Sequence, residues 1–218
     1  VGFASETTQP VNASTWTSTS LRDAIKKLPM GNIERGKIVN QQMFCASCHG
    51  EKGVAPTQNW PHIAGQRASY TAKLLLDYRD KRHITNQQGQ LMHDIAIMLS
   101  PQQIADVSAY YAAQPSAINE VVSSSKTSIN AEQLARKGDT SRLITPCASC
   151  HGAKGQGGNL EAPSLTGQNP LYFVKTMTDY KTGKRKNDVA HGMQNFAKKL
   201  SQEEIVALAN YYAHLHNK

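Results

Sequence analysis

The chain has 218 residues, and its 24 lysine and arginine residues against 16 acidic residues give a formal net charge of +8. No stretch reaches the roughly 20 apolar residues of a membrane-spanning helix, and the basic residues follow no nucleic-acid-binding pattern, so a membrane span and a nucleic-acid partner are not predicted. The length suggests one or two domains.

Residues 1–30 form an N-terminal extension. The first 20 residues are rich in serine and threonine and are predicted to be extended or mobile. The segment Leu21–Leu28 is predicted to form a short helix, which Pro29 would end. No chemical role for the extension follows from its residues.

The pentapeptide Cys-Ala-Ser-Cys-His occurs twice, at residues 45–49 and 147–151. Cys-x-x-Cys-His is the attachment signature of covalent haem c. The two-residue spacing lets both sulfur atoms reach the vinyl groups of one porphyrin, and it places the histidine beneath the iron. We therefore predict two haem c groups, with these thioether and proximal residues: Cys45, Cys48 and His49 in the first copy, Cys147, Cys150 and His151 in the second.

A zinc site shared by the two cysteine pairs is the minor alternative. The pairs lie 102 residues apart (147 − 45), whereas four-cysteine zinc motifs separate their pairs by about 15–20 residues. Each pair also has its own histidine, which a shared site would not need. Because the motifs use all four cysteines, neither a disulfide nor a cysteine nucleophile is predicted.

The repeat extends well beyond the haem motif and defines two domains. Matches at an offset of 102 residues include Gly36 with Gly138, Pro61 with Pro163, Gly65-Gln66 with Gly167-Gln168, Tyr70 with Tyr172, and Asp77-Tyr78 with Asp179-Tyr180. From Leu99-Ser100 with Leu200-Ser201 the offset is 101. We predict a first domain at residues 31–114, a linker at 115–126 and a second domain at 127–218.

Both domains are predicted to be all-α. Asn32 and Asn130 are candidate N-caps of a first helix that ends near the haem motif. A middle helix is expected at about Ala68–Asp80 and Leu171–Thr182, where apolar residues recur at helical spacing. The last helix opens in each domain with a serine followed three residues later by Gln or Glu, a capping box.

The second axial ligand of each iron is predicted to be a methionine. Of six methionines, only Met92 and Met193 match each other in the repeat, and each lies eight residues before the serine that caps the last helix. That position is expected to be a loop, free to fold over the haem. The remaining histidines do not match in the repeat and are expected at the surface or at a haem edge: His62, His83, His93, His191, His214 and His216.

These residues resemble the class I cytochromes c, and within them the dihaem cytochromes c4, over about residues 31–218. The resemblance implies two cytochrome c domains packed around a pseudo-twofold axis with their haem edges close. It implies that the carbonyls of Pro61 and Pro163 hold the imidazoles of the proximal histidines. It also implies that Gly36 and Gly138 let the first helix of each domain approach the last.

The resemblance implies an electron carrier rather than an enzyme, with no catalytic residue and no small-molecule substrate. The expected partners are redox proteins: a donor dehydrogenase or bc1-type complex, and a terminal oxidase or similar acceptor. One alternative is the electron-accepting cytochrome subunit of a sulfur-compound dehydrogenase. A catalytic dihaem enzyme such as a peroxidase is a weaker alternative, because it needs an open iron position and the paired methionines would fill both.

The positive charge of the second domain and the haem motifs indicate a type of partner and a cellular location. An acidic docking partner could be attracted by the basic residues of the second domain, most of all the run Lys181, Lys184, Arg185 and Lys186; ordinary solvation is the alternative interpretation. Covalent haem attachment implies export to the periplasm, after a signal peptide has been removed. A position at the surface of the inner membrane, within a membrane-associated complex, is compatible with this.

Overall fold

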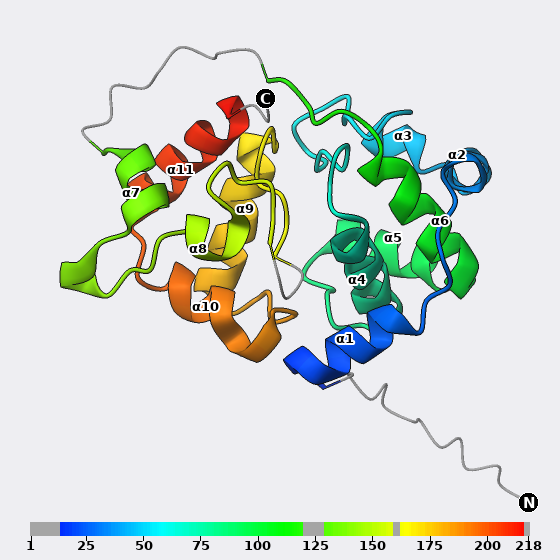
Figure 1. The fold of residues 1–218 in the computed structure, drawn as a ribbon, viewed down its shortest axis with the longest axis horizontal. Coiled ribbons are helices and arrows are strands. Elements are labelled where there is room, and N and C mark those ends of the chain that lie inside the picture. The colour runs from blue at the N-terminus through cyan, green and yellow to red at the C-terminus, as the bar shows by residue number, and fades with distance from the viewer. Residues whose placement is uncertain (1–13, 120–128, 159–161, 216–218) are drawn as a thin grey trace, which may run out of the picture.

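The computed structural model describes residues 14–119, 129–158 and 162–215, and these fold into two helical domains that lie side by side (Figure 1). Within the described residues the backbone forms no strand, only one isolated bridge between Asp139 and Ile144. The all-α prediction is confirmed.

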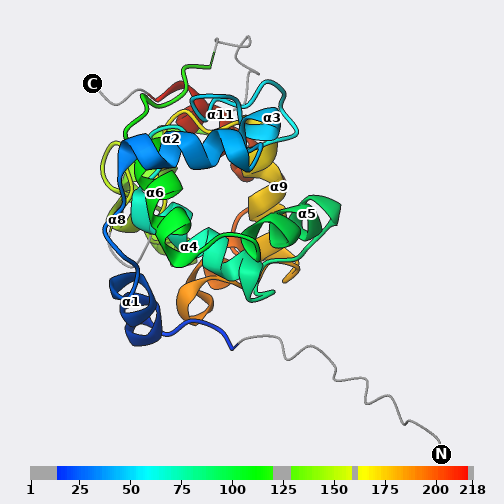
Figure 2. The same cartoon turned by 90° about the vertical axis from the view of Figure 1, so that its right-hand side faces the viewer.

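Each domain places its helices in the same order. The first contains α2 (Ile33–Gln42), α3 (Ala46–His49), α4 (Ala68–Arg79), α5 (Gln87–Ala96) and α6 (Pro101–Ala112); Figure 2 views it from its own end of the molecule. The second contains α7 (Ala131–Lys137), the 3₁₀ turn η1 (Thr140–Arg142), α8 (Ala148–His151), α9 (Pro170–Lys181), the 3₁₀ turn η2 (Val189–His191), α10 (Gly192–Ala197) and α11 (Gln202–His214).

The helix starts follow the local signals in the sequence. The side chains of Asn32 and Asn130 each accept a hydrogen bond from the backbone N–H three residues later. Ser100 and Ser201 form capping boxes at the starts of α6 and α11. Such caps satisfy backbone donors that the helix itself cannot, so four of the predicted starts are confirmed.

The two repeated glycines serve different purposes. A Cβ on Gly36 would lie 2.1 Å from the carbonyl oxygen of Asp106, so this glycine allows α2 to pack against α6 as expected. Gly138 instead ends α7 with a φ of +70°, a conformation that favours glycine. A Cβ there would strike the carbonyl oxygen of Ile144, not α11, so the expectation for Gly138 is wrong.

The described part of the N-terminal extension is folded onto the first domain. A helix, α1 (Ser18–Lys26), starts at the cap residue Thr17 and packs against α4. The short helix expected at Leu21–Leu28 is therefore present but begins three residues earlier, so the expectation of an extended or mobile chain is wrong for residues 18–20. Trp16 is buried just before it, because its indole N–H donates to Asp77 at 2.5 Å and the Arg82 guanidinium stacks 3.9 Å above its ring. Residues 1–13 lie outside the described residues.

The start of the predicted linker also packs against protein. Ala117 is buried, and the side-chain amide of Asn119 donates to the carbonyls of Gly167 and Ala213 in the second domain. Residues 120–126 of the predicted linker lie outside the described residues.

Two glutamines hold the domains together through symmetry-related contacts. Gln66 donates to the carbonyl of Ser164 at 3.0 Å and accepts from its N–H at 2.8 Å. Gln168 makes the same pair of bonds with His62, at 2.8 and 2.9 Å. Under the 102-residue offset the first pair maps onto the second, which is the exchange that a twofold axis produces.

The glutamine pairs generate a stability prediction. Gln66→Leu leaves the N–H and carbonyl of Ser164 unpaired in a buried interface. Each such group costs roughly 1–3 kcal/mol, so the free energy of unfolding of the haem-loaded protein, measured in denaturant, should fall by that order. Gln133→Leu on the exposed surface of α7 is the matched control; equal stability of the two variants would contradict the assignment.

A second prediction concerns the extension. Trp16→Phe keeps an aromatic ring but removes the donor to the buried Asp77 carboxylate. The free energy of unfolding should fall by roughly 1–3 kcal/mol. Arg22→Ala, on an exposed position of the same helix, should change it by less than about 0.5 kcal/mol. If Trp16→Phe is as stable as that control, the indole bond does not contribute to holding the extension.

Candidate haem sites

A cavity of about 1000 Å³ lies between the domains and is lined by residues of both. All eight side chains predicted to attach or ligate the two haems line it: Cys45, Cys48, His49, Met92, Cys147, Cys150, His151 and Met193. The sequence repeat therefore identified two sets of side chains that the fold brings to one continuous space.

The two proximal histidines are held in the same way. His49 Nδ1 lies 3.2 Å from the carbonyl oxygen of Pro61, and His151 Nδ1 lies 2.9 Å from that of Pro163. A carbonyl can only accept a hydrogen bond, so Nδ1 carries the proton and Nε2 keeps its lone pair. Nε2 is thus the nitrogen available to a metal, and the carbonyl fixes the ring orientation.

Burial favours the neutral form of both imidazoles. His49 and His151 are nearly buried, and burial lowers the pKa of each ring below the ordinary histidine value, while the bond to the prolyl carbonyl opposes that shift. A metal binds the neutral ring, so this environment favours ligation at neutral pH.

Met92 and Met193 lie on helices rather than on loops. Met92 is on α5, which begins at the N-cap Asn86, and Met193 is on the short helix α10. The expected loop position is therefore wrong, although both side chains line the cavity and pack against the apolar core of their own domain. A helix gives a methionine a more fixed position than a loop would.

No two of the four cysteines form a disulfide. In each pair the first cysteine is the N-cap of a one-turn helix, α3 or α8, and the second cysteine lies within that helix. Burial raises the pKa of the Cys45 thiol to about 11 and that of Cys147 in the same direction. Among the described residues, no three histidine, cysteine or acidic side chains gather as a metal cluster, which argues against a shared zinc site.

The donor set fits haem c in each domain. Two thiols, one imidazole with a free Nε2 and one thioether face the same cavity, whose walls are mainly apolar and aromatic. Imidazole and thioether are the axial ligand pair of the c-type cytochromes. The residues present can therefore hold the group that the motifs predict.

The histidines outside the haem motifs, which are the alternatives to methionine as second iron ligands, differ in their surroundings. Both ring nitrogens of His62 are engaged, since Nδ1 accepts from the Ala55 N–H at 3.0 Å and Nε2 lies 3.3 Å from the Asn119 side-chain oxygen. His93 is buried beside Met92, and its Nδ1 donates to the carbonyl of Tyr78 at 2.7 Å. His83 is also buried and lines the cavity. His191 is exposed.

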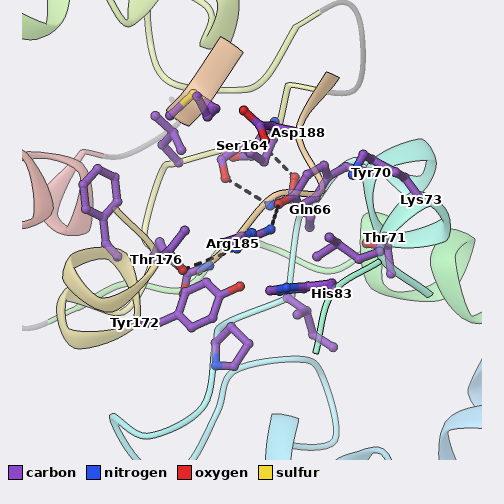
Figure 3. Close-up of a pocket in the computed structure, with 18 of the residues that line it drawn as sticks. Gln66, Tyr70, Thr71, Lys73, His83, Ser164, Tyr172, Thr176, Arg185 and Asp188 are labelled. Atoms are coloured by element: carbon purple, nitrogen blue, oxygen red, sulfur yellow. Dashed lines mark hydrogen bonds between the residues drawn. The ribbon is translucent and has the colours of Figure 1, made fainter. Parts of the chain in front are cut away.

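The expected basic docking run is only partly at the surface. Arg185 is 2% exposed and lies in the cavity wall (Figure 3), so it cannot meet a partner. The ammonium of Lys181 donates to the carbonyl of Leu200. Lys184 and Lys186 are exposed. A run of charges in the sequence does not reveal that one member points inward, because its partners belong to other elements.

Comparisons with known proteins agree across the chain. Residues 33–113 match the family model described as Cytochrome c, and residues 142–211 match the one described as Cytochrome C oxidase, cbb3-type, subunit III. Cytochrome c4 of Pseudomonas aeruginosa is 34% identical over 175 residues, covering 79% of this chain and 84% of that protein.

Two further relatives extend the comparison. The crystal structure of reduced recombinant cytochrome c4 from Pseudomonas stutzeri superposes with a TM-score of 0.75 at 31% identity, covering 85% of this chain and 100% of that one. The thiosulfate dehydrogenase electron acceptor of Stutzerimonas stutzeri is 31% identical over 178 residues, 81% of each chain.

Proposed function

The chain belongs to the cytochrome c4 family of dihaem electron-transfer proteins, and on this premise we propose which of its residues bind the irons. His49 with Met92, and His151 with Met193, are the axial pairs; the cysteines at 45, 48, 147 and 150 form the thioether bonds. The observation that carries the proposal is that one cavity is lined by both cysteine pairs, both oriented histidines and the two methionines that match in the repeat.

Each haem c supplies an iron that alternates between the ferrous and ferric states. The chain's own residues set the conditions for that exchange. The Pro61 and Pro163 carbonyls orient the histidines and increase their basicity as ligands, while a methionine ligand raises the reduction potential relative to a second histidine. Burial keeps water away from both sites, so little rearrangement accompanies electron transfer.

The protein acts as a carrier and not as an enzyme. A catalytic haem needs an open or displaceable position, and the proposed pairs occupy both positions on each iron. The relatives named cytochrome c4 are electron carriers. The continuous cavity between the domains supports electron exchange between the two haems before delivery to a partner.

The partners are redox proteins of the bacterial periplasm. A respiratory or dehydrogenase donor, such as a bc1-type complex, and a terminal oxidase acceptor suit the family; the relative named as a thiosulfate dehydrogenase electron acceptor supports a sulfur-compound dehydrogenase as the second candidate donor. No helix in the described part of the chain has the length and apolarity to cross a bilayer. Docking uses the exposed Lys184 and Lys186, which face solvent between α9 and α10.

The ligand assignment predicts a clear separation between methionines. Met92→Ala or Met193→Ala should open one iron to cyanide or carbon monoxide, because the thioether ligand is lost. Each variant should also reduce the intensity of the weak far-red absorption band that arises from methionine–Fe(III) bonds. Visible spectra of the oxidised and reduced protein measure both effects.

The control for this experiment is Met98→Ala. Met98 is 62% exposed and has no methionine counterpart in the repeat, so its removal should leave the spectrum and ligand binding as in the unaltered protein. Rapid cyanide binding by the unaltered protein would contradict the assignment and the carrier function together.

The docking assignment predicts a salt-dependent effect. The double substitution Lys184→Glu and Lys186→Glu should slow association with an acidic redox partner several-fold at low ionic strength, measured by stopped-flow reduction, because electrostatic steering is reversed. The difference should shrink as salt screens the charges. Lys26→Glu with Lys27→Glu, at the end of α1 and its C-cap, is the matched control; an equal effect in both variants would show that only net charge matters.

A further inference from the structure

Positions 83 and 185 are equivalent in the repeat but carry different residues, His83 in the first domain and Arg185 in the second (83 + 102 = 185). Each follows the middle helix of its domain and lies against the tyrosine near that helix's end. The His83 ring stacks on Tyr78 with 4.8 Å between centroids, and the Arg185 guanidinium lies 4.8 Å from the Tyr180 ring centroid. The first domain therefore has a titratable imidazole at the position where the second domain has a permanent cation.

Arg185 is a buried cation that binds only neutral groups in the described part of the chain. Its hydrogen bonds go to the Asn187 side-chain oxygen at 2.9 Å, the Tyr70 hydroxyl at 3.1 Å and the Thr176 hydroxyl at 3.5 Å. A buried charge is costly unless an opposite charge compensates it. The cavity that Arg185 lines is therefore suited to receive an anion.

His83 also lines the cavity (Figure 3). Its side chain is 7% exposed, and its Nδ1 has no hydrogen-bond partner among the described residues. Whereas Arg185 reaches Tyr70 across the interface, the shorter His83 makes no such bond to the equivalent Tyr172, which lines the same cavity. A buried polar atom left unpaired points to a group that the protein chain does not supply.

The charges around His83 are mostly positive. Burial together with Arg185, Lys73 and Lys175 holds the pKa of His83 well below its usual range. The two lysines are themselves paired with acidic side chains, Lys73 with Asp77 and Lys175 with Asp179. Asp188 lines the same cavity and accepts two hydrogen bonds from Gln194. An added carboxylate would offset the three cations and make protonation of the ring easier.

Haem carries two propionate carboxylates. A haem bound in this cavity would supply these anions to its wall. We infer that His83 hydrogen-bonds a propionate of the first-domain haem and binds a proton when that haem is reduced. The inference rests on the proposed function, because it requires a haem in this cavity.

The coupled step balances simply. The redox partner supplies one electron, which converts Fe(III) to Fe(II), and the solvent supplies one proton, which binds the imidazole. Reduction lowers the positive charge near His83, so the protonated ring is more stable in the reduced state. The midpoint potential of the first haem then falls as the pH rises. The second haem has no such link through position 185, because an arginine does not lose its proton.

Voltammetry of the dihaem protein between about pH 5 and 8, where histidine ordinarily titrates, tests this. In the unaltered protein one of the two midpoint potentials should fall with rising pH, by at most about 59 mV for each tenfold change in proton activity in a one-electron couple. Met92→Ala identifies that wave, because it removes the methionine ligand of the first haem only.

Exchange of the two residues supplies the decisive variants. His83→Arg, which copies the second domain, should abolish the slope, and His83→Gln, a neutral side chain of similar size, should do the same if the arginine does not fit. Arg185→His should give the second wave a slope of its own. His214→Gln, outside the cavity, is the control and should retain the original slope.

The outcomes separate this inference from the proposed function. If the slope persists in both His83 variants while the methionine–iron band is intact, His83 is not the proton-binding group and the carrier function still stands. If the unaltered protein lacks the methionine band, the ligand assignment itself fails. A slope that disappears only in the His83 variants supports the inference.

Discussion

The hydrogen bonds that Gln66 and Gln168 make across the domain interface fix the geometry on which both haem sites depend. Gln168 binds the N–H and carbonyl of His62, the residue directly after Pro61, whose carbonyl orients His49. Gln66 binds Ser164, directly after Pro163, in the same way. Each domain therefore supports the backbone that orients the proposed iron ligand of its neighbour. The domain interface and the two proximal histidines are therefore parts of one hydrogen-bonded unit.

A buried polar network completes this interface on one side of the cavity. Asn187, from the second domain, donates to the Asp77 carboxylate at 2.6 Å and accepts from Lys73 through its carbonyl at 2.7 Å. Trp16 of the extension adds a third donor to the same carboxylate. Burying an ion pair gives little net stability compared with apolar packing, but removing one partner is costly. The network consequently favours this arrangement of the domains, because another arrangement would remove the bonds that Asn187 makes with Asp77 and Lys73.

The sequence predicts those features that are local or repeated. The caps at Asn32, Asn130, Ser100 and Ser201 depend on residues three positions apart, and the repeat register selects the residues that line the cavity. The distance of Met92 from Ser100 does not show that Met92 lies on a helix. Asn86, which is the N-cap of that helix, is a local signal for it. The burial of Arg185 and the packing of Trp16 depend on contacts between residues far apart in the chain, which no local pattern records.

The duplication has kept some contacts and lost others, and the pattern follows physical need. The bonds of Gln66 to the second domain match those of Gln168 to the first, because each haem site needs the same backbone support. The lysine–aspartate pairs on α4 and α9 are also repeated, yet Asp77 is fully buried with three donors, while Asp179 is 9% exposed and paired with Lys175. At 83 and 185 the charge itself differs. Because Coulomb interactions strengthen where water is excluded, such differences act on the irons more strongly than differences at the surface. Two domains with one fold thus offer an electron two unequal sites.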